Sequence, residues 1–184
     1  MPSYLELSDA RLAELFLPDA AQSLLFLLTG PRGSGKTRLC QHLQRVAHRQ
    51  GATTGGVISP AVMRGTHKIG VNLALLPGEE TLSLAYLRDQ PHPAASTKYW
   101  RMDERSLARG NAHLARLAPP DLLIIDELGP LEFEDDDGLT AAFALIDARA
   151  WRWAVVVVRP SLLDAALARW PWARVIDLSG ENAA

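Results

Sequence analysis

Residues 30–37 read GPRGSGKT, and this stretch decides the fold prediction for the chain. It fits the pattern G-x-x-x-x-G-K-[ST] in full. The residues before it, 23–29, read SLLFLLT and are continuously apolar, as in a strand buried on both faces. The residues after it, 38–51, read RLCQHLQRVAHRQG and carry apolar side chains at helical spacing. A buried strand, a glycine-rich turn and the start of a helix together predict a phosphate-binding loop.

The chemistry of such a loop follows from its backbone. Glycines let successive N–H groups curl around an anion, and the helix N-terminus adds its dipole. Lys36 is expected to reach the β- and γ-phosphates, and the Thr37 hydroxyl to bind Mg²⁺. The residues predicted to contact the nucleotide are Gly30, Pro31, Arg32, Gly33, Ser34, Gly35, Lys36, Thr37 and Arg38. The pattern leaves the base and the reaction open.

A second stretch, LLIIDELGPLEF at residues 122–133, ends an apolar run in two adjacent acids. A phosphate-binding loop requires an acid at the end of a neighbouring strand to hold the metal, and Asp126 fits that position. Glu127 is a candidate catalytic base that orients and deprotonates a water molecule. The alternative for Glu127 is a surface or structural acid. Asp126 follows Lys36 by 126 − 36 = 90 residues, which favours a class with a strand between the two motif strands and a catalytic glutamate.

Strands and helices alternate along the rest of the chain, which predicts an α/β fold with a mainly parallel sheet flanked by helices. Apolar runs and an expected turn at 63–66 indicate one antiparallel hairpin inserted into it. We expect one domain over residues 1–184, with 1–20 as an N-terminal helical extension and 85–100 as a loop. Helices are predicted at 8–16, 38–51, 103–118, 136–150 and 161–170, and strands at 23–30, 55–62, 67–80, 121–127, 153–158 and 173–178.

Four further side chains are candidates for lesser roles. Arg159 follows a predicted central strand, at the end where ligands bind in open α/β sheets. It either contacts the γ-phosphate as a third catalytic residue or forms a salt bridge near Pro160. Arg64 and Lys68 flank the hairpin turn and are interpreted as solvated charges. Asn182 is a candidate for contact with the base or ribose.

Composition excludes several classes of protein. The net charge of −2 gives no reason to expect nucleic acid as a partner. The single cysteine, Cys40, forms no internal disulfide, and the N-terminal residues lack the pattern of a secretory signal, so we expect a cytoplasmic protein. The apolar stretches are far shorter than the ~20 residues of a membrane span, so no membrane association is expected. A protein partner or a homo-oligomer stays open.

With both motifs in place, the chain resembles the THEP-type nucleoside-triphosphatases, also called cancer-related nucleoside-triphosphatases. The resemblance rests on GPRGSGKTRL, on the hairpin region GGVISPAVMRGTHKIGVNLALLPGEE, on IIDELGPLE and on the last strands VVVVRP and VIDLSGEN. It covers roughly residues 23–182. IIDELGPLE is close to the family's Asp-Glu-Ile-Gly-x-Met-Glu and is the most specific of the four. Gly129 and Glu132 also match this motif, and we expect a structural or supporting role for them.

The resemblance implies a RecA-like P-loop NTPase fold and Mg²⁺-dependent hydrolysis of nucleoside triphosphates to diphosphates. It gives Lys36, Thr37, Asp126 and Glu127 their usual roles. Two alternatives share the phosphate-binding loop. A nucleotide or small-molecule kinase would close residues 85–101 as a lid over an acceptor, and a nucleotide-switched binding module would hydrolyse slowly while it holds a partner protein.

Overall fold

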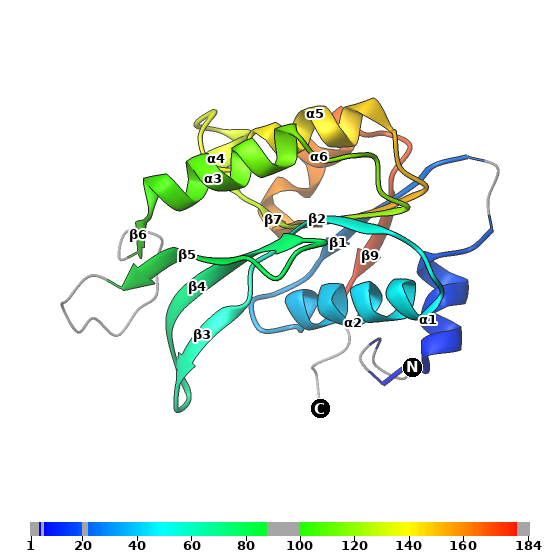
Figure 1. Ribbon diagram of the computed structural model, residues 1–184, viewed down its shortest axis with the longest axis horizontal. Coiled ribbons are helices and arrows are strands. Elements are labelled where there is room, and N and C mark those ends of the chain that lie inside the picture. The colour runs from blue at the N-terminus through cyan, green and yellow to red at the C-terminus, as the bar shows by residue number, and fades with distance from the viewer. Residues whose placement is uncertain (1–3, 5, 20–21, 88–99, 180–184) are drawn as a thin grey trace.

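The computed structural model describes residues 4, 6–19, 22–87 and 100–179 of the chain (Figure 1). The strands are β1 (Leu24–Thr29), β2 (Thr54–Ile58), β3 (Ala61–Arg64), β4 (His67–Leu76), β5 (Thr81–Leu87), β6 (Trp100–Met102), β7 (Leu122–Leu128), β8 (Trp153–Val158) and β9 (Arg174–Asp177). The helices are α1 (Asp9–Phe16), α2 (Lys36–Arg49), α3 (Glu104–Ala115), α4 (Pro130–Phe133), α5 (Ala141–Ala148) and α6 (Leu163–Arg169), with a 3₁₀ turn, η2, at Pro160–Leu162. Within these described ranges, no helix is both long and apolar enough to cross a membrane.

All described strands belong to one sheet, in the order β6-β5-β4-β2-β7-β8-β1-β9, with β3 paired to β4. The strands β2, β7, β8, β1 and β9 run parallel to one another, whereas β3 to β6 pair in antiparallel fashion. The predicted α/β class with a mainly parallel sheet and an antiparallel insertion is confirmed. The strand β8 lies between β7 and β1, so the two motif strands are separated as expected.

The parallel strands are buried on both faces because helices cover both sides of the sheet (Figure 1). In β1, Leu25 and Leu27 belong to the core on the side of α3, α5 and α6. Phe26 and Leu28 belong to the core on the side of α1 and α2. Alternation of side chains along a strand explains why a run such as LLFLLT is apolar throughout.

The antiparallel part of the sheet is larger than the single predicted hairpin. The predicted strand at 67–80 is too long, because β4 ends at Leu76 and the chain turns back at 77–80 to form β5. The loop predicted at 85–100 is wrong at both ends, since Ala85 to Leu87 belong to β5 and Trp100 begins β6. Residues 88–99, the rest of the predicted loop and of the kinase-type lid, lie outside the described residues.

The N-terminal helix α1 contributes to the core beneath the sheet. The Ser8 hydroxyl accepts a hydrogen bond from the backbone N–H of Arg11 at 3.3 Å and caps the helix. Leu12 and Phe16 are fully buried in the cluster that also contains residues of α2. The predicted helix at 8–16 is therefore confirmed, and its apolar face covers the same side of the sheet as α2.

A prediction concerns Gly56 in β2, the strand that leads to the candidate site. Gly56 has a φ of +112°, and an added Cβ would lie 2.0 Å from the carbonyl oxygen of Ile124 in β7. Gly56→Ala should lower the free energy of unfolding by on the order of 3 kcal/mol, because both the backbone and the strand spacing must shift. Urea denaturation measures this. Gly78→Ala is the control, since its Cβ would meet nothing closer than 3.6 Å; equal midpoints for the two variants would contradict the prediction.

Candidate active site

The loop between β1 and α2 has the conformation that its glycines predict. Gly30, Gly33 and Gly35 have φ angles of +136°, +84° and +90°, a region that side chains other than glycine rarely adopt. Gly35 is the residue that caps α2, so the helix begins directly at Lys36. The loop therefore leads from a buried strand to a helix N-terminus, as an anion-binding loop requires.

The Lys36 ammonium group lies over this loop. It donates hydrogen bonds to the carbonyl oxygens of Gly30 at 2.7 Å and Pro31 at 2.8 Å. Burial lowers the pKa of Lys36, while the negative charges of Glu127 and Asp126 act in the opposite direction. The cation is thus held between the loop carbonyls and the two acids of the second motif.

Asp126 is buried at the end of β7, with 2% of its surface exposed. Its two carboxylate oxygens accept one hydrogen bond from the Thr37 hydroxyl at 3.3 Å and one from the backbone N–H of Ser59 at 3.1 Å. Burial raises the pKa of Asp126 to about 6, although both hydrogen bonds act to lower it. The predicted pair of metal ligands, Thr37 and Asp126, is therefore in direct contact.

The donor atoms present suit Mg²⁺. A hydroxyl and a carboxylate are hard oxygen ligands, and Mg²⁺ sites of this type use one or two protein oxygens together with phosphates and water. No group of three or more His, Cys, Asp or Glu side chains in the described part of the chain is arranged to hold a metal. A hydroxyl and a carboxylate together fit a metal that is held jointly by the protein and a bound phosphate chain.

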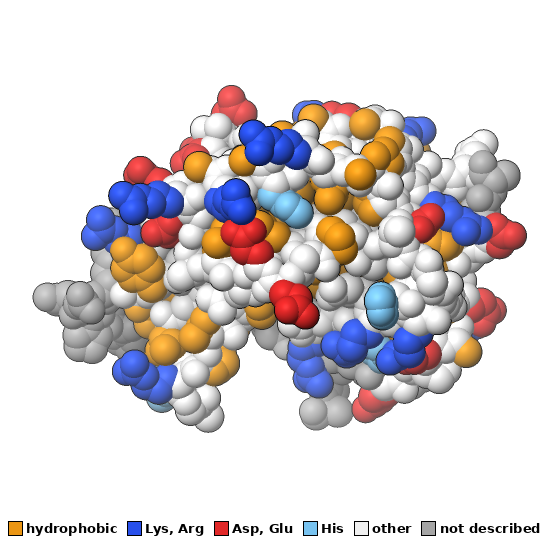
Figure 2. All heavy atoms as spheres, viewed as in Figure 1, with side chains coloured by type: hydrophobic (Ala, Val, Ile, Leu, Met, Phe, Trp, Pro, Cys, Tyr) orange, Lys and Arg blue, Asp and Glu red, His pale blue; other side chains and the backbone are white. Residues whose placement is uncertain are grey.

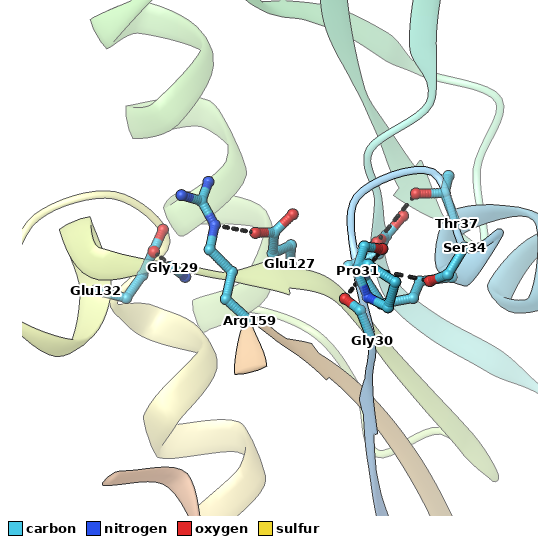
Figure 3. A network of polar contacts seen from close by, with 10 residues as sticks. Gly30, Pro31, Ser34, Thr37, Glu127, Gly129, Glu132 and Arg159 are labelled. Atoms are coloured by element: carbon cyan, nitrogen blue, oxygen red, sulfur yellow. Dashed lines mark hydrogen bonds and ion pairs between the residues drawn. The ribbon is translucent and has the colours of Figure 1, made fainter. Parts of the chain in front are cut away.

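Glu127 and Arg159 form an ion pair beside the loop (Figure 3). The Arg159 Nε donates to Glu127 Oε1 at 2.5 Å. Arg159 follows the last residue of β8, the strand between β7 and β1, so its side chain emerges between the two motifs. The peptide bond between Asp126 and Glu127 is cis. The predicted salt bridge of Arg159 exists, and its partner is the candidate catalytic base.

Glu132, the last acid of the motif, has a structural position. Its two carboxylate oxygens accept from the backbone N–H groups of Gly129 at 2.7 Å and Leu139 at 2.9 Å. Burial raises the pKa of Glu132, and the two hydrogen bonds oppose that shift. Glu132 therefore ties the end of β7 to the segment before α5, which agrees with the structural role expected from the motif.

The two charges of the hairpin differ from each other. Arg64 is exposed, as predicted for a solvated turn residue. Lys68 is half-buried, with its ammonium nitrogen 5.4 Å from the centre of the Trp100 ring. Its interpretation as a solvated charge is wrong, because antiparallel pairing with β3 and β5 brings this part of β4 beside other side chains.

The residues of the predicted nucleotide contact differ in exposure. Pro31, Arg32, Gly33 and Arg38 are exposed, and Ser34 is buried. Asn182 lies outside the described residues. Sequence reasoning missed Ser59, whose contribution is a backbone N–H that leaves no trace in side-chain patterns. It also missed that Lys68 is half-buried. The available signal was the position of Lys68 in the strand after the turn.

Comparison with known proteins gives a consistent result. The model of a family described as NTPase matches residues 25–165. Nucleoside-triphosphatase THEP1 of Thermococcus kodakarensis is 34% identical over 137 residues, which are 73% of this chain and 76% of that protein. Nucleoside-triphosphatase THEP1 of Pyrococcus abyssi is 29% identical over 116 residues, which are 63% of this chain and 64% of that protein.

A solved structure supports the fold. The crystal structure of THEP1 from the hyperthermophile Aquifex aeolicus matches with a TM-score of 0.55 over 87% of this chain and 92% of that chain. The two sequences are 18% identical in this match, so the likeness concerns the fold.

A second prediction concerns Glu132. Glu132→Gln should lower the free energy of unfolding by about 1–3 kcal/mol, because the amide nitrogen would face a backbone N–H that loses its acceptor. Urea denaturation at neutral pH measures the change. Glu134→Gln, two residues away on the exposed surface, is the matched control and should change stability by less than about 0.5 kcal/mol. Equal losses in both variants would argue against a structural role for Glu132.

Proposed function

The chain belongs to the NTPase family, and on that premise we propose that it hydrolyses nucleoside 5′-triphosphates to the diphosphate and phosphate with the help of Mg²⁺. One observation carries the proposal: the acid-bearing end of β7 lies against the first turn of α2, through the hydrogen bond from Thr37 to Asp126. This contact supports the proposal because it brings Thr37, Asp126 and, beside them, Lys36 and Glu127 to one edge of the sheet. The names of the related proteins agree with hydrolysis.

Binding of the triphosphate is the first step. The backbone N–H groups of the loop and the N-terminus of α2 would bind the β- and γ-phosphates, and the Lys36 ammonium would exchange the carbonyls of Gly30 and Pro31 for phosphate oxygens. Thr37 and Asp126 are the residues that would hold Mg²⁺, which neutralises charge on the phosphate chain. These contacts depend on phosphates and not on the base, which fits hydrolysis of several nucleoside triphosphates.

Cleavage requires a water molecule whose oxygen attacks the γ-phosphorus. The bond between that phosphorus and the oxygen that bridges the β- and γ-phosphates then breaks. The Glu127 carboxylate would orient this water and accept its proton, which then passes to solvent. Glu127 suits the role because it is partly exposed, unlike its buried neighbour Asp126. In this proposal Asp126 binds the metal and Glu127 accepts the proton.

Arg159 would act on both partners of the reaction. Its Nε holds the Glu127 carboxylate in place, and its two terminal nitrogens are the groups that would meet the γ-phosphate. A guanidinium in this position stabilises the charge that develops on the transferring phosphate. The ion pair alone fits the salt-bridge alternative, and the proposal of Arg159 as a third catalytic residue rests on its position beside Glu127 at the end of β8.

The domain organisation and the cellular compartment are part of the same proposal. We propose a one-domain enzyme acting in the cytoplasm, where Cys40 stays a buried free thiol. The described residues offer no observation that favours the kinase or the nucleotide-switched binding module over hydrolysis.

A third prediction tests the function directly. Phosphate release from ATP, GTP, CTP and UTP should require Mg²⁺ in the wild-type protein. Glu127→Gln should still bind nucleotide, yet it should release phosphate about 10²–10⁴-fold more slowly, because the amide does not accept the proton. Lys36→Ala should instead weaken nucleotide binding. The proposal fails if wild-type protein binds nucleotide without releasing phosphate, and the role of Glu127 fails if Glu127→Gln turns over normally.

A fourth prediction concerns Arg159. Arg159→Ala should lower kcat by about 10²-fold, as for loss of one charge-stabilising donor, with a smaller effect on KM. Steady-state phosphate release measures both constants. Arg152→Ala is the matched control, since Arg152 precedes the opposite end of β8 and pairs with Asp19. If both variants lose activity to the same extent, Arg159 acts through the stability of β8 and not at the phosphate.

A further inference from the structure

The hairpin of β3 and β4 is joined directly to the active site. It follows β2 through Ser59, whose backbone N–H donates to the Asp126 carboxylate. Beyond that point the hairpin extends past the sheet on the side where α2 begins (Figure 1). In the same view, the surface is hollowed between the hairpin and α2 (Figure 2). A nucleotide bound at the loop would therefore have the hairpin as a neighbouring wall.

Lys68 lies near the start of β4, opposite Met63 in the register of the hairpin. Paired residues of an antiparallel ladder lie on the same face, so Lys68 and Met63 share one face. Arg64 and His67 form the adjacent pair and lie on the other face. The Lys68 ammonium lies over the Trp100 ring in a cation–π contact. Such a contact does not use the hydrogen-bond donors of the ammonium group.

The charges named as acting on Lys68 come from the loop and from the ends of β7 and β8. Burial lowers the pKa of Lys68, as do the positive charges of Arg32 and Arg159, while Glu127 and Asp126 raise it. Of these charged groups, Arg32 has the largest effect on the pKa of Lys68, and it belongs to the phosphate-binding loop. The Lys68 ammonium therefore lies within electrostatic range of the loop and of both acids, where the negative charge of a bound phosphate would also act on it.

We propose that Lys68 contacts the terminal phosphate of a bound nucleoside triphosphate and stabilises the negative charge that develops as this phosphate is transferred to water. The inference rests on the proposed function and adds a residue from the opposite wall of the site. Lys36 and Arg159 approach the phosphates from the sheet, and Lys68 approaches from the hairpin. A point charge on a flexible stem suits this task, since it follows the phosphate as its geometry changes.

The experiment compares Lys68→Met with Lys68→Arg and with the matched control Arg64→Met. The methionine keeps the apolar stem against Trp100 and removes the charge, whereas the arginine keeps the charge. Lys68→Met should lower kcat for phosphate release by about 10–10²-fold, and Lys68→Arg should restore most of it. Arg64→Met, on the other face of the same turn, should leave turnover unchanged. Equal urea midpoints for the three variants establish that all of them fold.

Binding provides a second readout that a structural role would not change. The affinity of Lys68→Met should fall for a non-hydrolysable triphosphate analogue with Mg²⁺ and stay unchanged for the diphosphate, because Lys68 meets the terminal phosphate only. Normal turnover in Lys68→Met, or equal loss of affinity for both nucleotides, would overturn the inference. If the wild-type protein releases no phosphate, the proposed function fails by itself, and the difference between triphosphate and diphosphate binding still decides the role of Lys68.

Discussion

The carboxylate of Asp126 is the contact on which the active site depends. An acid with 2% exposure is costly unless its oxygens are hydrogen-bonded, and here each oxygen has one protein donor. The Thr37 donor fixes the first turn of α2, and the Ser59 donor fixes the start of the hairpin. Three segments far apart in the sequence are therefore held together by one buried charge. A bound cation would meet this carboxylate in a position that the fold has already determined.

The charge balance around Asp126 explains why the site suits a polyanion. Lys36, Lys68 and Arg159 each lie within the electrostatic reach of the two acids, and Arg32 adds a further positive charge from the loop. Asp177 adds a further negative charge near Lys36. Burial lowers the pKa of both Lys36 and Lys68, which means that their charged forms are less stable there than in water. The negative charge of a bound phosphate chain would stabilise the charged forms of both lysines and offset that cost.

The local parts of this site were predictable from the sequence. The loop and Asp126, the proposed metal ligand, each belong to a short continuous motif. The backbone geometry of the two motifs follows from glycine positions and strand ends. A strand between the two motif strands was expected, but the sequence did not show that this strand is β8, so the pairing of Glu127 with Arg159 was not predictable. The position of Lys68 depends on the twist of a hairpin whose register shifts between Val62 and Met63. The strand β5 was missed although Leu82 and Leu84 alternate along it, because the turn at 77–80 was read as part of the preceding strand.

The specificity of the DELGPLE motif also has a physical explanation. Its first two acids are the proposed metal ligand and the proposed base, whereas Glu132 accepts hydrogen bonds from the backbone on both sides of α4 and fixes how the chain leaves β7. Gly138 belongs to the same unit, because an added Cβ there would lie 2.1 Å from Glu132 Oε1. A substitution in the second half of the motif would therefore displace the strand end that positions Glu127. In the proposed function, the placement of the base and the support beneath it are therefore one structural unit.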